Sequence, residues 1–120
     1  MVVDELDALR DKFEGCAALA FADLSTKMIL VTDSGSNLRR EALDALCAEA
    51  AFLLGANGTP ALAEQPSDKA SVTSPSQMRV FLRAEQEPND VLCCICNSKL
   101  DADAFVADAG ACLDRISGSE

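Results

Sequence analysis

The stretch Leu38–Leu54, LRREALDALCAEAAFLL, consists mostly of alanine, leucine, glutamate and arginine, the residue types that form helices most readily. Either Ser36 or Asn37 can cap the first turn, because a side-chain oxygen at that position accepts a hydrogen bond from a free backbone N–H. Gly55 follows and tolerates the left-handed conformation that often ends a helix. The sequence therefore predicts a helix from residue 38 to residue 54.

Apolar side chains cover two sides of this predicted helix. At about 100° per residue a first line occupies roughly half of the circumference, and it contains Leu38, Ala42, Leu43, Leu46, Cys47, Ala50, Leu53 and Leu54. A second line, of Ala45, Ala48 and Phe52, runs between the acidic residues Glu41, Asp44 and Glu49. One face of a sheet can bury the first line but leaves the second uncovered. We therefore expect a second surface to pack on this helix.

Two other segments are apolar at every position and predict central strands. Residues 16–22 read CAALAFA, and residues 91–96 read VLCCIC. Strands without a polar side are typical of positions that are covered on both faces of a sheet. Residues 69–73 instead alternate polar and apolar side chains and begin with Lys69. A short strand that carries a lysine is typical of the edge of a sheet.

The rest of the chain supplies two more strands and two more helices. Residues 28–32 predict the return strand of a hairpin, and residues 77–84 alternate as a strand with one apolar side. Helical spacing predicts terminal helices over about 3–14 and about 98–117. The order α-β-β-α-β-β-β-α predicts an α/β (α+β) fold in one domain over residues 1–120. We expect a five-stranded antiparallel sheet with the long helix on one face and the N- and C-terminal helices on the other.

The composition excludes several classes of partner. The formal net charge is −10, and the chain has no histidine, tryptophan or tyrosine. An acidic surface without these aromatic groups repels phosphate, so we expect neither nucleic acid nor an anionic membrane as a partner.

No apolar run approaches the ~20 residues of a membrane span. Acidic residues follow Met1 closely, which is not the pattern of a secretory signal. We therefore expect a cytoplasmic protein whose six cysteines are reduced thiols.

The residue types of enzymes and metal sites are poorly represented. Without histidine, a nucleophilic triad of the usual kind and a mixed zinc site are both excluded. Cys93 and Cys96 have CxxC spacing, but on a strand they point to opposite faces. We interpret the thiols as buried and inert, with a redox or metal role as the alternative. No glycine-rich phosphate loop is present, and we predict no catalytic residue, no cofactor and no metal.

Basic residues stand out on this acidic chain. Arg39 and Arg40 form a basic pair, which we expect either to pair locally with Glu41, Asp44 or the first helix, or to contact a partner or form an ion pair across a dimer. Arg79 and Arg83 share one face of the fourth predicted strand and are candidates for local salt bridges.

The pattern resembles the roadblock (dynein light-chain) family, which has a profilin-like fold. The resemblance is carried by the order of elements, by Leu6, Leu9 and Gly15 at the first helix, and by the alanine–leucine middle helix. It covers residues 3 to 116. One departure is the turn of the first hairpin, Asp23–Lys27, which has no glycine where the family has Asp or Asn followed by Gly.

The resemblance implies a non-catalytic homodimeric adaptor. In such proteins the long helices pack antiparallel and the third strands pair into one continuous sheet, and relatives act beside Ras-like small GTPases. Carried over to this chain, the candidates for the dimer interface are Glu41, Ala45, Ala48, Phe52, Lys69, Ser71 and Thr73.

Two other classes of protein fit the sequence less well. A small acidic secretion chaperone is also a dimeric α/β protein of this size, but it usually has three strands before its middle helix, whereas two are predicted here. A monomeric ligand-sensing domain of the PAS or GAF type needs a pocket, and the apolar strands offer few polar groups to line one.

Overall fold

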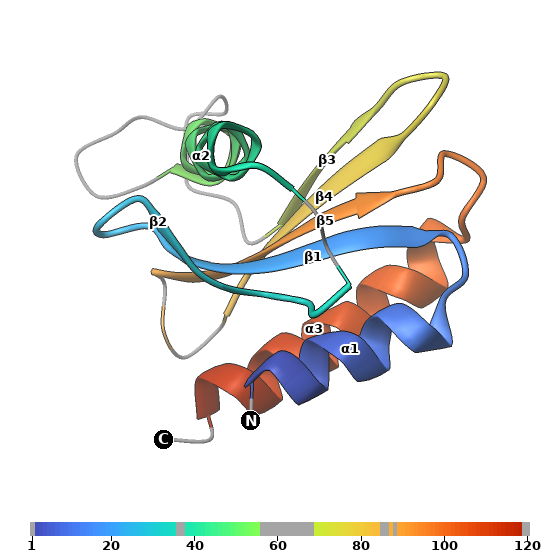
Figure 1. Cartoon of the computed structure of the whole chain (residues 1–120), viewed down its shortest axis with the longest axis horizontal. Coiled ribbons are helices and arrows are strands. Elements are labelled where there is room, and N and C mark those ends of the chain that lie inside the picture. The colour runs from blue at the N-terminus through green and yellow to red at the C-terminus, as the bar shows by residue number, and fades with distance from the viewer. Residues whose placement is uncertain (1, 36–37, 56–68, 85–86, 88, 119–120) are drawn as a thin grey trace.

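The computed structural model describes residues 2–35, 38–55, 69–84, 87 and 89–118. Its elements are α1 (Val2–Lys12), β1 (Cys16–Asp23), β2 (Met28–Thr32), α2 (Arg40–Ala50), the π-helical turn η1 (Ala51–Gly55), β3 (Lys69–Thr73), β4 (Met78–Arg83), β5 (Asp90–Cys96) and α3 (Ala102–Gly118). The strands form one antiparallel sheet in the order β2-β1-β5-β4-β3. Helix α2 covers one face, and α1 and α3 lie side by side on the other (Figure 1). The predicted fold is confirmed.

The two apolar segments are the centre of the sheet, as their composition predicts. Strands β1 and β5 pair along nearly their whole length. On β5, Val91 and Cys93 face α2, whereas Leu92, Cys94 and Cys96 face the layer of α1 and α3. The sheet therefore separates two apolar clusters, and both central strands contribute to each of them.

The middle helix differs from its prediction at both ends. Helix α2 begins at Arg40, and Arg39 occupies the N-cap position without a side-chain hydrogen bond. The predicted caps Ser36 and Asn37 lie outside the described residues. The α-helix ends at Ala50, and η1 continues it as one wider turn.

The end of η1 is tied to the sheet by Arg83 of β4. Its Nη2 donates to the carbonyl of Leu54 at 2.8 Å. This bond satisfies one of the carbonyls that the end of a helix leaves without an intrahelical partner.

The turn of the first hairpin contains no glycine, and side-chain hydrogen bonds to Asp23 stabilise it instead. The Asp23 carboxylate accepts from the Ser25 N–H at 3.1 Å, from the Ser25 hydroxyl at 2.8 Å and from the Thr26 hydroxyl at 3.1 Å. Lys27 then adopts the left-handed conformation at φ 56°. Partial burial opposes ionisation of Asp23, but the bonds from Ser25 and Thr26 outweigh it and hold the pKa below its ordinary value.

The end of β2 is fixed by the buried residue Asp33, which the sequence did not single out. Its Oδ1 accepts from the Leu19 N–H at 2.9 Å, and its Oδ2 lies 3.4 Å from Nε of Arg10 in α1. One turn earlier on α1, Asp7 accepts from the N–H of Ser34 at 2.8 Å and from its hydroxyl at 2.7 Å. Two carboxylates therefore join β1, α1 and the chain that leaves β2.

Candidate interaction surfaces

The two apolar lines of the middle helix are in different environments. In the first line Leu46, Cys47, Ala50 and Leu54 are buried under the helix, and Leu38, Ala42, Leu43 and Leu53 are half-buried. In the second line Ala45 and Ala48 are exposed, and Phe52 is 53% exposed. An aromatic side chain left half in water is an uncompensated apolar surface. The helix therefore carries an outer apolar line that the sheet does not cover.

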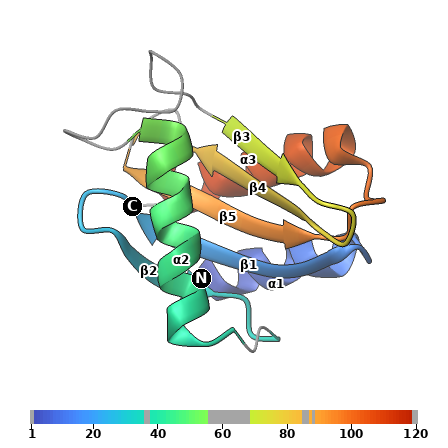
Figure 2. The ribbon, with the colours of Figure 1, turned by 90° about the horizontal axis from the view of Figure 1, so that it is seen from above.

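The edge strand β3 lies next to the end of this outer line. Within the part of the chain that the structure describes, all of its Cα partners are on β4, so its other side is an open edge there. Lys69, Ser71 and Thr73 are exposed, as the alternation predicts. Strand β3 contacts η1, the turn that carries Phe52. Figure 2 shows α2 crossing the sheet, with its first turns beside β2 and its last turns toward β3. The predicted interface residues of the helix and of the strand are thus on neighbouring elements.

A bidentate salt bridge holds α2 in this orientation. Arg79 of β4 donates to Glu49 through Nε at 2.6 Å and through Nη2 at 3.1 Å. The bond with Glu49 raises the pKa of Arg79 above its ordinary value. The predicted local salt bridge of Arg79 is therefore present, and its partner is an acidic residue that flanks the outer apolar line.

The basic pair at the start of α2 has no local partner in the described residues. Arg39 and Arg40 are exposed, and neither forms an ion pair with Glu41, with Asp44 or with α1 in this part of the chain. Arg40 instead lines a hollow of about 270 Å³ between α2 and β2. The structure thus places Arg40 beside β2, the second edge strand of the sheet, a location that the sequence did not indicate.

The thiols are buried and unfavourable for ionisation. All six cysteines are free and buried, and Cys93 and Cys96 lie on opposite faces of the sheet, as predicted. Burial raises the pKa of Cys93 and Cys94 above the ordinary value. Cys16 differs, because a hydrogen bond with Cys96 across the sheet lowers its pKa. No group of three or more metal-ligating side chains is found among the described residues.

Comparisons with solved structures place this geometry in one fold. A roadblock/LC7 domain from Streptomyces avermitilis superposes with a TM-score of 0.73 at 10% identity, covering 96% of this chain and 93% of that one. MglB from Myxococcus xanthus gives a TM-score of 0.72 at 14% identity, covering 99% and 96%. LokiProfilin1, solved in complex with rabbit actin, gives 0.61 at 14% identity, covering 99% and 96%. No protein-family model matches the sequence, and no curated protein is significantly similar to it.

The chain therefore has the fold of the roadblock (LC7) domains, which is profilin-like. The resemblance inferred from the order of elements and from the middle helix is confirmed at the level of the fold. Within the described residues no helix is long and apolar enough to cross a bilayer.

Proposed function

We propose that this protein is a non-catalytic, homodimeric adaptor of the roadblock type. The observation that carries the proposal is the outer apolar line of α2 and η1, where Ala45, Ala48 and Phe52 remain exposed while the first apolar line is buried or half-buried. A second copy that packs on this line removes Phe52 from water, and the two alanines allow close approach of the helix backbones. The proposed interface thus follows from the second apolar line.

The edge of β3 continues the same interface. In an interface with two-fold symmetry the same patch is used by both copies. Antiparallel pairing of two β3 strands about Ser71 brings Lys69 of one copy opposite Thr73 of the other, so the lysines do not oppose each other. Backbone groups on the open edge then gain hydrogen-bond partners, and the two sheets become one. Glu41 completes the proposed set at the first turn of α2.

We further propose that the dimer acts in the cytoplasm as a platform for a Ras-like small GTPase. Support comes from the roadblock fold together with the absence of a phosphate-binding loop from the sequence, so the nucleotide chemistry would belong to the partner. The secretion-chaperone alternative fits less well, because α2 follows two strands instead of three.

Light scattering on purified protein tests the dimer. We expect the wild-type chain to have twice the mass of one copy at micromolar concentration and the variants Phe52→Asp and Ala48→Arg to be folded monomers. Ala104→Arg places the same change at an exposed alanine of α3 and should leave the dimer intact. A folded wild-type monomer would contradict the proposal.

Affinity capture from the native host tests the GTPase. Tagged protein is incubated with lysate in the presence of GDP or of a GTP analogue. We expect a small GTPase to be retained more strongly with one nucleotide than with the other. Recovery of unfolded client segments, with no dependence on nucleotide, would instead support the chaperone class.

A further inference from the structure

The second edge of the sheet, β2, lacks the charged residues and the proline that often protect an edge strand. Its sequence, MILVT, has no charge and no proline, and no strand among the described residues pairs with its outer side. Met28 and Leu30 are 50% and 52% exposed. Natural edge strands are usually protected by short length, by a bulge, by charged residues or proline, or by a covering element, and β2 has only the short length and a bulge. Strand β2 therefore presents free backbone groups together with apolar side chains.

A bulge explains why a leucine faces water here. Phe21 pairs with Val31 and Ala22 pairs with Ile29, so Leu30 is the extra residue of the bulge. Ile29 packs on the α2 side of the sheet and Val31 on the side of α1 and α3. The two neighbours of Leu30 thus pack on the two apolar clusters, one on each side of the sheet. The side chain of Leu30 itself packs on neither cluster and is exposed at the edge.

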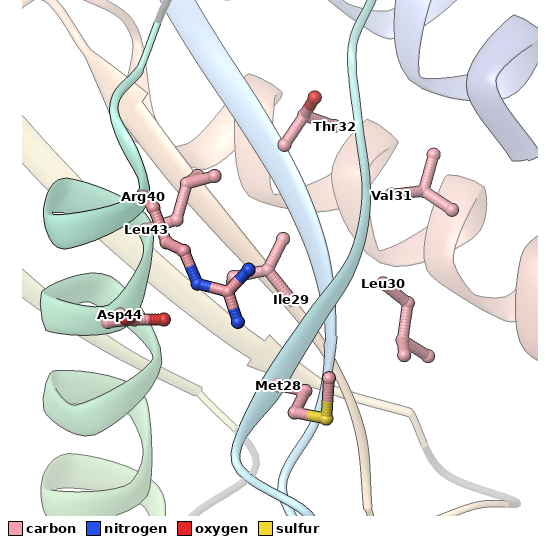
Figure 3. Close-up of a pocket in the computed structure, with 8 residues that line it drawn as sticks. All are labelled: Met28, Ile29, Leu30, Val31, Thr32, Arg40, Leu43 and Asp44. Atoms are coloured by element: carbon pink, nitrogen blue, oxygen red, sulfur yellow. The ribbon is translucent and has the colours of Figure 1, made fainter.

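The two sides of this edge differ in chemistry. On the side of α2, the hollow of about 270 Å³ is lined by β2 and by Arg40, Leu43 and Asp44. Figure 3 shows the Arg40 side chain extending from α2 into the space beside β2, whereas Leu30 and Val31 point away from that helix. A strand added to this edge would present alternate side chains to these two environments.

Charge determines which residues fit the α2 side. Arg40, whose side chain extends into the hollow, and Lys27, which directly precedes β2, are exposed and form no ion pair among the described residues, although the chain carries a net charge of −10. Among the described residues that line the hollow, Asp44 is the one carboxylate, one helical turn from Arg40. Carboxylates on the added strand would therefore meet unpaired cations, and apolar residues would meet Met28 and Leu30.

We propose that β2 binds an extended acidic segment of another polypeptide as an additional strand, with acidic and apolar side chains alternating along it. A second copy of β2 does not supply this chemistry, because MILVT contains no carboxylate. The edges β2 and β3 are at opposite ends of the sheet, and on α2 the hollow is lined by Arg40, Leu43 and Asp44, which alternate with the proposed dimer residues Glu41 and Ala45.

Fluorescence anisotropy with designed peptides tests this proposal. The probe is a labelled peptide of alternating valine and glutamate, about ten residues long. We expect it to bind, and a peptide with lysine in place of glutamate to bind at least about tenfold more weakly. An acidic peptide N-methylated at alternate residues, on the side that faces β2, should lose binding because strand addition depends on backbone hydrogen bonds.

Variants of β2 and of α2 test the apolar and the charged contacts of the edge separately. Arg40→Glu and Leu30→Lys should each weaken binding of the acidic peptide about tenfold while circular dichroism stays unchanged. Lys99→Glu makes the same change in charge sign at another exposed site and should have little effect. Equal binding of the lysine peptide, no effect of Arg40→Glu, or no binding at about 1 mM peptide would overturn the proposal. So would a fall in oligomeric mass caused by Leu30→Lys, because a second copy would then cover the edge.

Discussion

The two edge strands of the sheet, β3 and β2, differ in composition and in the polar interactions that stabilise them. Strand β3 alternates polar and half-buried side chains and begins with an exposed lysine. Strand β2 has no charge and exposes Met28 and Leu30. The polar edge lies next to the outer apolar line of α2, whereas the apolar edge has Lys27 and Arg40 beside it. We infer that the first edge fits a second copy of the chain and the second fits a different, acidic partner.

The supports of the two edges differ as well. The β2 hairpin is fixed by carboxylates: Asp23 at its turn and Asp33 and Asp7 at its end. The surface beside β3 is held by the salt bridge between Glu49 and Arg79 and by the bond from Arg83 to the end of η1. Changes in these supports should therefore affect one edge and spare the other.

The largest loss of stability is expected from Asp33→Ala. The substitution leaves the buried N–H of Leu19 without its acceptor and removes the anion beside Arg10. We expect the free energy of unfolding to fall by about 2–3 kcal/mol, measured by urea denaturation. Asp33→Asn retains an acceptor oxygen and should lose less. Equal stability of Asp33→Ala and wild type would contradict the role of this residue in fixing β2.

A smaller effect is expected from Glu49→Gln. The Glu49–Arg79 pair is bidentate but partly exposed, with side-chain exposures of 29% and 24%. We expect a loss of about 1 kcal/mol, reduced by added salt because the pair is reached by solvent. The exposed residue Glu14 provides the control, and Glu14→Gln should change the urea midpoint little. A larger effect at Glu14 than at Glu49 would rule out this pair as the support of α2.

The smallest expected effect is on the pH dependence of the free energy of unfolding, and it involves Asp7. The backbone and side-chain bonds from Ser34 hold the pKa of Asp7 below its ordinary value. A carboxyl whose pKa is lowered by folding stabilises the native state above its unfolded pKa, and the contribution is lost as the pH falls through the folded pKa. The stability of Asp7→Asn should therefore fall less than that of wild type on acidification below the ordinary aspartate range. Parallel pH profiles of the two proteins would refute this contribution.

The sequence predicts the sheet and its layers because apolar composition reports burial directly. Residues 16–22 and 91–96 were expected to be central because they lack a polar side, and both are. The exposure of Ala45, Ala48 and Phe52 followed in the same way from helical periodicity. Their assignment to a dimer interface stays a prediction, as does that of Glu41, Lys69, Ser71 and Thr73.

The features that the sequence did not predict depend on contacts between residues that are distant in the chain. In the sequence Asp33 follows a predicted strand and has the residue type of a turn. Only the fold places it beside Leu19 and Arg10, where its buried carboxylate fixes the end of β2. The exposure of Leu30 depends on a bulge, and a shift in register by one residue is not visible in a five-residue apolar strand. The location of Arg40 beside β2 likewise follows from the path of α2 across the sheet.

The measurement that tests the central claim most directly is the mass of the wild-type chain in solution, determined by light scattering over a series of micromolar concentrations. The outer line of α2 and the edge of β3 predict a dimer that Phe52→Asp converts into a folded monomer, whereas Ala104→Arg leaves it a dimer. A wild-type protein that remains a folded monomer across the series, or a Phe52→Asp dimer as stable as that of wild type, would contradict it.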